Sequence, residues 1–262
     1  MIHTITESGL DLQEKSSSIL LLHGLGVYGE SWWYQKQALH EAGYFPIAPD
    51  LPGFGSTPAD EHSWSVAKAA ESAVRVLDQA GIEQTVVCGL SMGGVVALEL
   101  ALSRPDRLSG LVLINTFAAL RPANLGEVIY FVRRGARTYL RSPADQAEKV
   151  AQRVFPHPTQ GEWRKRLVES IRSSDPVIYR KSMMALAKFN VSRKLDRITM
   201  PTLVITGTED STIPPQVQTR MARKIPGAVQ YLIHGAGHGV IVDHYEEVNA
   251  LLLDFLAQIY PS

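Results

Sequence analysis

The stretch from residue 85 to residue 103 constrains the fold of this chain more than any other. It joins a short apolar run at residues 86–88 to the sequence GLSMGG and then to a helical pattern at residues 95–102. A serine between two glycines at a strand-to-helix turn is typical of a nucleophile elbow, whose tight backbone leaves no room for bulky neighbours. The pattern therefore predicts Ser91 as a nucleophile. An ordinary glycine-rich turn with a helix-capping serine is the alternative, because short motifs also match by chance.

The rest of the chain repeats the order of strand and then helix. Mostly apolar runs predict further strands at residues 18–22, 44–48, 108–115, 201–206 and 229–233. Such runs are typical of strands buried on both faces of a parallel sheet. Helical patterns predict helices at residues 31–42, 65–80, 216–225 and 245–260. Together they predict an α/β fold with a mostly parallel, doubly wound sheet.

This alternation stops between residues 117 and 197. Only helical stretches and prolines occur there, and roughly 80 residues without a strand are too many for a loop. We therefore expect a helical cap at 117–197, inserted between two parts of the α/β core at 1–116 and 198–262. Residues 2–7 and 10–14 alternate weakly in polarity, which predicts an antiparallel hairpin at the edge of the sheet.

Composition excludes several classes of protein. With 262 residues, 45% of them hydrophobic, the chain can build one large α/β domain with an insertion, as a monomer or a dimer. Its single cysteine, Cys88, excludes an intramolecular disulfide and predicts a buried thiol in a reducing cytoplasm. No targeting segment and no apolar run near the ~20 residues of a membrane span is present, so we expect no membrane association. A net charge of zero argues against nucleic-acid binding.

A serine nucleophile needs a histidine base and a carboxylate that orients the histidine. Asp210 ends the sequence GTED just after one expected strand, and His238 ends GAGH just after another. Glu209 and His234 in the same loops are the alternatives. We favour Asp210 and His238 because a flexible glycine loop can carry a base over the strand ends. Position 115 holds asparagine, which closes the alternative of an acid after the preceding strand.

An intermediate formed at Ser91 would need two N–H donors for its oxyanion. The amide of Met92 is expected to supply one donor. The sequence HGLG after the strand at 18–22 offers the other through the amide of Leu25, with Gly24 allowing a close approach. We expect His23 to hold loops together by hydrogen bonds rather than to transfer protons.

The same loop also matches the dinucleotide pattern G-x-G-x-x-G from Gly24 to Gly29, and Asp50 lies where a ribose-binding acid would be. A nicotinamide- or flavin-dependent oxidoreductase is therefore an alternative. It leaves Ser91, Asp210 and His238 unexplained, whereas an oxyanion loop uses the same glycines. We expect no cofactor and no metal.

The sequences HGLG, DLPGFGS, GLSMGG, GTED and GAGH together resemble the capped α/β-hydrolase superfamily over essentially the whole chain. The resemblance implies a catalytic triad of Ser91, Asp210 and His238 and an oxyanion hole from the amides of Leu25 and Met92. It implies hydrolysis of an ester or thioester through an acyl-enzyme. Serine rather than aspartate at position 91 argues against haloalkane dehalogenase and epoxide hydrolase chemistry.

Within the superfamily the chain resembles small carboxylesterases, including the biotin-pathway esterases that act on methyl esters bound to acyl carrier protein. It also resembles the hydrolases that cleave carbon–carbon bonds of vinylogous diketones, so that reaction is an alternative. A non-catalytic receptor of the same fold is the alternative from another class.

The expected cap indicates what the substrate is like. Its candidates for the wall of an acyl pocket are apolar residues: Phe117, Phe131, Met183, Met184 and Phe189. Residues 118–197 hold 12 arginines and 5 lysines against 7 acidic residues. Arg133, Arg137 and Arg141 recur on one face of the helix expected at 127–141. This row predicts an anionic substrate or an acidic partner such as an acyl carrier protein. A solvated basic face without a specific role is the alternative.

Overall fold

The computed structural model describes residues 17–59, 64–120 and 143–261 of the chain. In these residues six strands form one sheet in the order β2-β1-β3-β4-β5-β6, and every neighbouring pair is parallel. The strands are β1 (Ser18–Leu22), β2 (Phe45–Ile47), β3 (Thr85–Leu90), β4 (Leu108–Ile114), β5 (Thr202–Gly207) and β6 (Val229–Ile233). The expected α/β class is confirmed. The hairpin expected at residues 2–14 lies outside the described residues.

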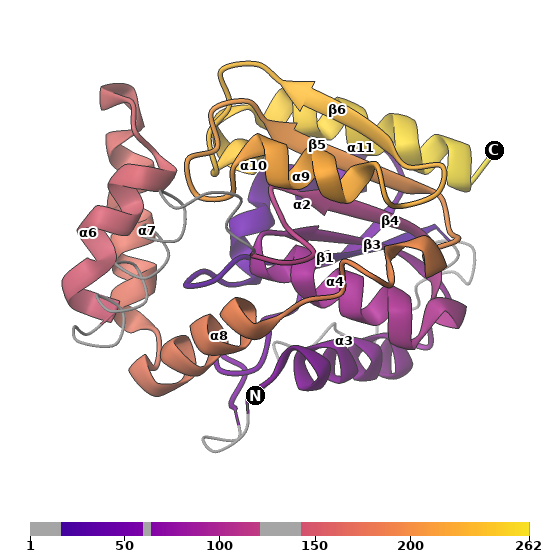
Figure 1. Ribbon diagram of the computed structural model, residues 1–262, viewed down its shortest axis with the longest axis horizontal. Helices are drawn as coiled ribbons and strands as arrows, with labels where there is room; N and C mark the ends of the chain where they lie inside the picture. Colours follow the sequence, from indigo (N-terminus) through magenta and orange to yellow (C-terminus); the bar gives the residue numbers. More distant parts are fainter. Residues whose placement is uncertain (1–16, 60–63, 121–142, 262) are drawn as a thin grey trace.

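Helices cover both faces of the sheet (Figure 1). One face carries α3 (Val66–Ala80), α4 (Met92–Ser103) and α9 (Pro215–Ala222), and the other carries α2 (Trp33–Glu41), α10 (Val240–Asp243) and α11 (Tyr245–Ile259). Alternate residues of a strand enter opposite layers: Leu20 and Leu22 pack with the first group of helices, Ile19 and Leu21 with the second. Because both faces are covered, residues 19–22 of this strand are all apolar.

The helix ends follow local sequence signals. Ser65 caps α3 by accepting a hydrogen bond from the N–H of Lys68, and Gly81 ends the helix with a φ of 69°. Short 3-10 helices, η1 (Gly29–Trp32) and η2 (Pro105–Arg107), precede α2 and β4. No helix in the described ranges combines the length and apolar character that crossing a bilayer requires.

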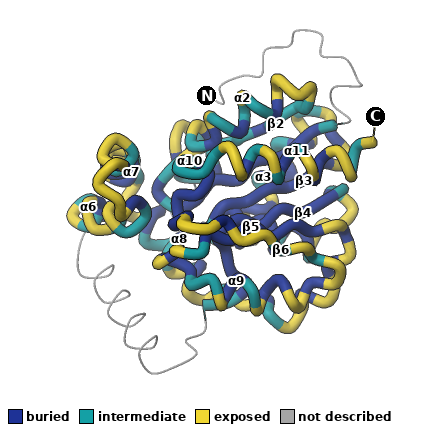
Figure 2. Tube along the Cα trace, turned by 90° about the horizontal axis from the view of Figure 1, so that it is seen from above, coloured by how far each residue is buried: buried dark blue, intermediate teal, exposed yellow. Residues whose placement is uncertain are grey.

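The chain between β4 and β5 supplies α6 (Pro143–Val154), α7 (Gly161–Ser173) and α8 (Pro176–Lys188), here called the cap helices, and the 3-10 helices η3 (Pro158–Gln160) and η4 (Leu195–Arg197). Pro143, Pro158 and Pro176 each begin a helix rather than interrupt one. An isolated bridge between Ala119 and Asn190 is the only strand-like pairing within the described part of the segment. Figures 1 and 2 show α6 and α7 standing at one end of the sheet. The division of the chain at residues 117 and 197 stays a prediction.

Candidate active site

Ser91 lies at the tight turn between β3 and α4. Its φ of 54° and ψ of −112° are strained for a residue with a Cβ. Hydrogen bonds to the end of β4 hold it there: the Ser91 N–H donates to the carbonyl of Ile114 at 3.0 Å, and the Ser91 carbonyl accepts from Thr116 Oγ1 at 2.7 Å. The turn thus has the geometry of an elbow that projects a side chain beyond the carboxyl end of the strand.

Two glycines of the turn are required by space. A Cβ at Gly93 would overlap the carbonyl group of Leu22, and a Cβ at Gly89 would overlap the carbonyl group of Gly93. The start of α4 therefore rests directly against the ends of β1 and β3. This close packing places the N-terminus of α4 beside the Ser91 side chain.

Asp210 and His238 meet in the structure although 28 positions separate them. The Nδ1 of His238 lies 2.9 Å from Oδ2 of Asp210. The Asp210 side chain is fully buried, and 10% of the His238 side chain is exposed. The other carboxylate oxygen of Asp210 accepts from the N–H groups of Thr212 at 2.8 Å and Ile213 at 2.9 Å. The carboxylate is therefore held in one orientation and can orient the imidazole in turn.

The two alternative residues lie elsewhere. His234 is exposed in the loop after β6, and neither it nor Glu209 lines the cavity beside Ser91. The Glu209 side chain is 56% exposed, and its carboxylate lies 3.9 Å from His157 Nε2. The geometry thus favours Asp210 and His238 over Glu209 and His234.

The loop after β1 passes beside Ser91. A Cβ built on Gly24 would lie 3.8 Å from the Ser91 Cβ, so the missing side chain leaves that space open. Within the described ranges, no hydrogen bond is formed by the N–H groups of Leu25 or Met92. Leu25 lines the cavity, whereas Met92 is fully buried at the start of α4.

His23 is fully buried and ties two loops together. Its Nδ1 lies 2.8 Å from the carbonyl oxygen of Gly24, and its Nε2 accepts from the N–H of Leu51 at 2.9 Å. Burial lowers the pKa of His23 to about 4, against a smaller opposing effect of the Gly24 carbonyl and Asp50. A neutral imidazole with one donor and one acceptor nitrogen fits both contacts. His23 thus has the loop-fastening role that the sequence predicts.

Asp50 does not present its carboxylate to a nucleotide site. Its Oδ1 accepts from the N–H of Gly29 at 2.8 Å, and its Oδ2 accepts from the N–H of Ser56 at 2.8 Å. Moreover, η1 rather than an α-helix follows the glycine loop directly. The pattern G-x-G-x-x-G therefore serves the packing of this loop. Among the described residues no group of three or more His, Cys, Asp or Glu could hold a metal ion.

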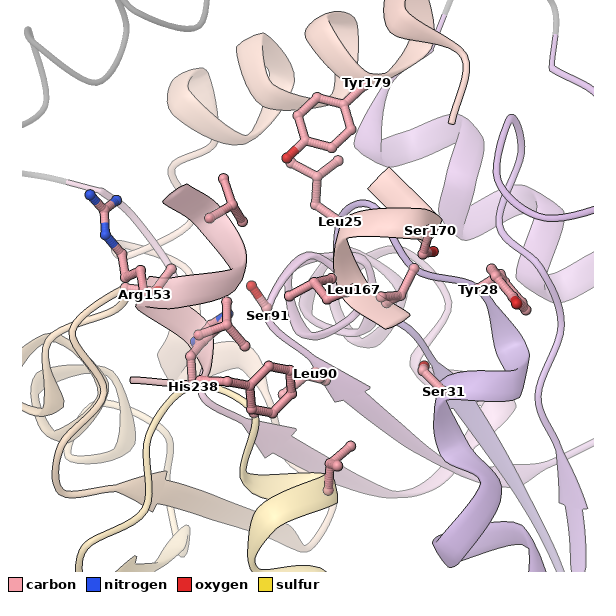
Figure 3. Close-up of a pocket in the computed structure, with 18 of the residues that line it drawn as sticks. Leu25, Tyr28, Ser31, Leu90, Ser91, Arg153, Leu167, Ser170, Tyr179 and His238 are labelled. Atoms are coloured by element: carbon pink, nitrogen blue, oxygen red, sulfur yellow. The ribbon is translucent and has the colours of Figure 1, made fainter. Parts of the chain in front are cut away.

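A cavity of about 1460 Å³ opens over Ser91 and His238. Figure 3 shows the Ser91 hydroxyl directed into it, between Leu25 and His238. Side chains of the cap helices form the opposite wall, which places the core residues and the inserted helices on two sides of one space. Its mostly apolar lining suits an acyl group.

The structure places some of the expected acyl-pocket residues at the cavity and others away from it. Phe117, Met183 and Met184 line the cavity. Phe189 does not line it, because the chain leaves the helical conformation there at the end of α8 and the ring packs against the main core. Phe131, Arg133, Arg137 and Arg141 lie outside the described residues. Several apolar residues that line the cavity were not expected from the sequence: Tyr34, Leu120, Phe155, Trp163, Leu167, Tyr179 and Ile241.

Two further buried residues contact the proposed base and acid. Asn115 donates to the backbone carbonyl of His238, and Gln218 donates to the carboxylate of Asp210. From the sequence, Asn115 indicates only that no acid follows β4. No motif surrounds Gln218 in α9. A signal existed only for Asn115, a polar residue that directly follows an apolar strand.

Cys88 lies in the interior of β3 as a free, fully buried thiol, as expected. Burial raises the pKa of this thiol. A thiol that remains protonated in the core is a poor nucleophile.

Known proteins resemble this chain over most of its length. A protein of Variovorax paradoxus with the name "Putative carbamate hydrolase RutD" is 30% identical over 250 residues, and the alignment covers 92% of this chain and 92% of that protein. An esterase of Thermogutta terrifontis, solved with malate bound, is 28% identical with a TM-score of 0.79, covering 92% of this chain and 90% of that one. A hydrolase of Pseudomonas aeruginosa is 26% identical with a TM-score of 0.81, covering 91% and 89%.

The sequence profile of the alpha/beta hydrolase fold matches residues 18–245. This range includes all six strands, the cap helices, Ser91, Asp210 and His238. The named relatives support a hydrolase activity. The chain therefore belongs to the alpha/beta hydrolase fold family.

Proposed function

We propose that this protein is a serine hydrolase that cleaves a carboxylic ester or thioester through an acyl-enzyme, without a cofactor. One observation carries the proposal: Ser91 and His238 line the same cavity, and the Nδ1 of His238 lies 2.9 Å from Oδ2 of Asp210. A serine hydroxyl alone is a weak nucleophile, and a histidine oriented by a carboxylate is the group that activates it.

The reaction begins when Ser91 Oγ bonds to the acyl carbonyl carbon and His238 Nε2 takes the hydroxyl proton. Asp210 holds the Nδ1–H side of the imidazole and stabilises its positive charge. The N–H groups of Leu25 and Met92 receive the oxyanion. Collapse of the intermediate releases the alcohol or thiol, which leaves with the proton from His238. Water then attacks the acyl-enzyme with His238 as the base and frees the acid.

A carbamate is the second candidate substrate. It presents the same kind of carbonyl to Ser91, and the name of the Variovorax relative favours it. Hydrolysis of a carbon–carbon bond next to a carbonyl stays an alternative, because the triad would serve that reaction too.

The same proposal includes an anionic group on the substrate. Arg180, in α8, lines the cavity, and its Nε is enclosed without a hydrogen-bond partner among the described residues. The guanidinium of Arg180 could therefore pair with a carboxylate of a substrate in the cavity. The Thermogutta esterase binds malate, which is also an anion. An acyl group carried by an acidic carrier protein is a special case of such a substrate.

The experiment compares the wild type with Ser91→Ala on p-nitrophenyl butyrate, a butyryl thioester, a p-nitrophenyl carbamate and a vinylogous diketone. We expect the ester or thioester to turn over fastest and Ser91→Ala to lose turnover by several orders of magnitude. Mass spectrometry should locate a fluorophosphonate label on Ser91. Turnover that survives in Ser91→Ala, or a label on another residue, would refute the mechanism.

A further inference from the structure

Two amide side chains, Asn115 and Gln218, join the acid and the base of the proposed triad, and the mechanism above gives them no role. Both are fully buried. Asn115 directly follows β4, and Gln218 lies in α9. They therefore approach the loops of Asp210 and His238 from two other elements of the core.

Asn115 holds the loop of the base. Its Nδ2 donates to the carbonyl oxygen of Gly237 at 2.9 Å and to that of His238 at 3.1 Å. Its Oδ1 accepts from the N–H of Gly207, the last residue of β5, at 2.9 Å. One side chain thus connects the ends of β4 and β5 to the backbone that carries the imidazole. Asn115 has a φ of 44°, a conformation that asparagine tolerates better than most residues.

Gln218 holds the carboxylate of the acid. Its Nε2 lies 3.2 Å from Asp210 Oδ2 and 2.9 Å from the carbonyl oxygen of Ile213, with a longer contact of 3.4 Å to Asn115 Oδ1. Oδ2 is also the oxygen that faces His238 Nδ1. Two backbone N–H groups hold the other carboxylate oxygen, Oδ1. Gln218 is therefore the side-chain donor that contacts the same oxygen, Oδ2, as the imidazole of His238.

Packing alone does not explain a glutamine at this position. Its Oε1 is enclosed and lacks a hydrogen-bond partner in the part of the chain that the structure describes. An unpaired buried polar atom destabilises the folded state, and methionine of similar volume would avoid this. The neighbouring buried residues of α9, Val217 and Met221, are apolar. The donor end of the amide is therefore the reason to keep it.

We propose that Asn115 and Gln218 are positioning residues: Asn115 sets the place of the His238 backbone, and Gln218 orients the Asp210 carboxylate toward Nδ1. The inference rests on the proposed function, because it takes His238 as the base. Neither amide lines the cavity, so both act through the triad and not on the substrate. A misplacement of about 1 Å can cost about 100-fold in rate, so a small shift of the imidazole is enough.

The test replaces each amide. Gln218→Met keeps the volume and removes the donor, and we expect kcat for p-nitrophenyl butyrate to fall roughly 10- to 100-fold with KM unchanged. Gln218→Glu should lower kcat further, because it turns a second carboxylate against Asp210. Asn115→Gly removes the side chain but keeps the positive φ accessible, and should lower kcat like Gln218→Met.

Gln230→Met is the matched control. Gln230 Nε2 donates to Thr206 Oγ1 at 2.9 Å and to Thr219 Oγ1 at 3.2 Å, so it joins β6 to β5 and α9 away from the triad. We expect its kcat to stay at the wild-type value even if the free energy of unfolding falls. If Gln230→Met lowers kcat as much as Gln218→Met at equal loss of unfolding free energy, the network serves stability only and the proposal is wrong.

A spectroscopic readout separates this proposal from the proposed function. The strongly deshielded proton NMR resonance of His238 Nδ1–H, assigned by its loss in His238→Ala, should shift or broaden in Gln218→Met and Asn115→Gly and persist in Gln230→Met. Wild-type kcat and resonance in both amide variants would overturn the positioning role while Ser91→Ala still tests the mechanism. If Ser91→Ala stays active, the proposed function fails, and the resonance alone decides whether the amides position His238.

Discussion

The two sides of the cavity are held in different ways. On the sheet side, Ser91, Asp210 and His238 lie on short loops whose backbone groups are hydrogen-bonded to strand ends. On the other side, the cap helices contact the core through side chains. Tyr34 and Trp163 meet edge to face with ring centroids 5.8 Å apart. Ser170 Oγ donates to the carbonyl of Gly26 at 2.8 Å.

This difference indicates that the sheet side carries the chemistry and that the cap side sets the substrate selectivity. A wall of interlocked backbone groups has one arrangement, which the reacting atoms require. A wall of helices that touch the core through side chains can shift or change sequence without disturbing the sheet. We therefore expect substitutions on the sheet side to change kcat or stability, and substitutions on the cap side to change KM.

The largest expected effect comes from the sheet side. His238→Ala removes the base and should lower kcat by several orders of magnitude, with Asp210→Asn costing less, because the imidazole stays in place with a weaker orienting partner. Steady-state kinetics measures the activity, and circular dichroism checks the folding separately. Equal activity in His238→Ala and wild type would remove the distinction between the two walls.

The second prediction concerns the acid stability of the sheet side. The folded pKa of His23 is about 4, below the ordinary value of 6.5, so between these values the unfolded chain binds a proton that the folded chain does not. The stabilisation from His23 is therefore complete above pH 6.5 and is lost as the pH falls toward 4, by about 3 kcal/mol in total.

Urea unfolding at several pH values measures this loss. His23→Gln cannot take up the proton and serves as the reference that cancels the other titrating groups. We expect the wild type to lose more stability than His23→Gln on acidification. Parallel curves for the two proteins would contradict the assignment of a neutral, buried imidazole.

On the cap side, Arg180→Met should raise KM roughly tenfold for a p-nitrophenyl monoester of a dicarboxylic acid, because a charge-assisted hydrogen bond is lost. KM for p-nitrophenyl butyrate should not change. Arg172→Met is the control, since Arg172 pairs with Glu148 at 3.3 Å and does not line the cavity. An equal effect of Arg180→Met on both esters would refute the recognition of an anion.

The smallest expected effect is at the contact between the two walls. Trp163→Leu removes the aromatic contact with Tyr34, which is worth about 0.5–1.5 kcal/mol. Hydrogen exchange should become faster in α7 and stay unchanged in β3, and KM should rise a few-fold. Faster exchange in both elements would mean that the cap helices and the sheet open as one unit, and the two sides of the cavity would then not differ in rigidity.

Much of the sheet side was predictable from the sequence. The inner strands β1, β3, β4 and β5 are mostly apolar because both faces of the sheet are covered there. The elbow requires glycines because the carbonyl groups of Leu22 and Gly93 leave no space for a Cβ. The cap side was less predictable. Phe189 has the same apolar character as Met183, yet only Met183 lines the cavity, because the end of α8 turns Phe189 toward the core.

The sequence by itself determined the α/β class, the turn at Ser91 and the loops of Asp210 and His238, because each depends on residues that are neighbours in the chain. Only the tertiary structure decided that Asn115 donates to the carbonyl of His238, 123 positions away, and that Gln218 faces Asp210. A polar residue after a strand or within a helix has the same local pattern whether it meets water or a buried carboxylate. Its partner is set by how the elements pack, and no local pattern encodes that packing.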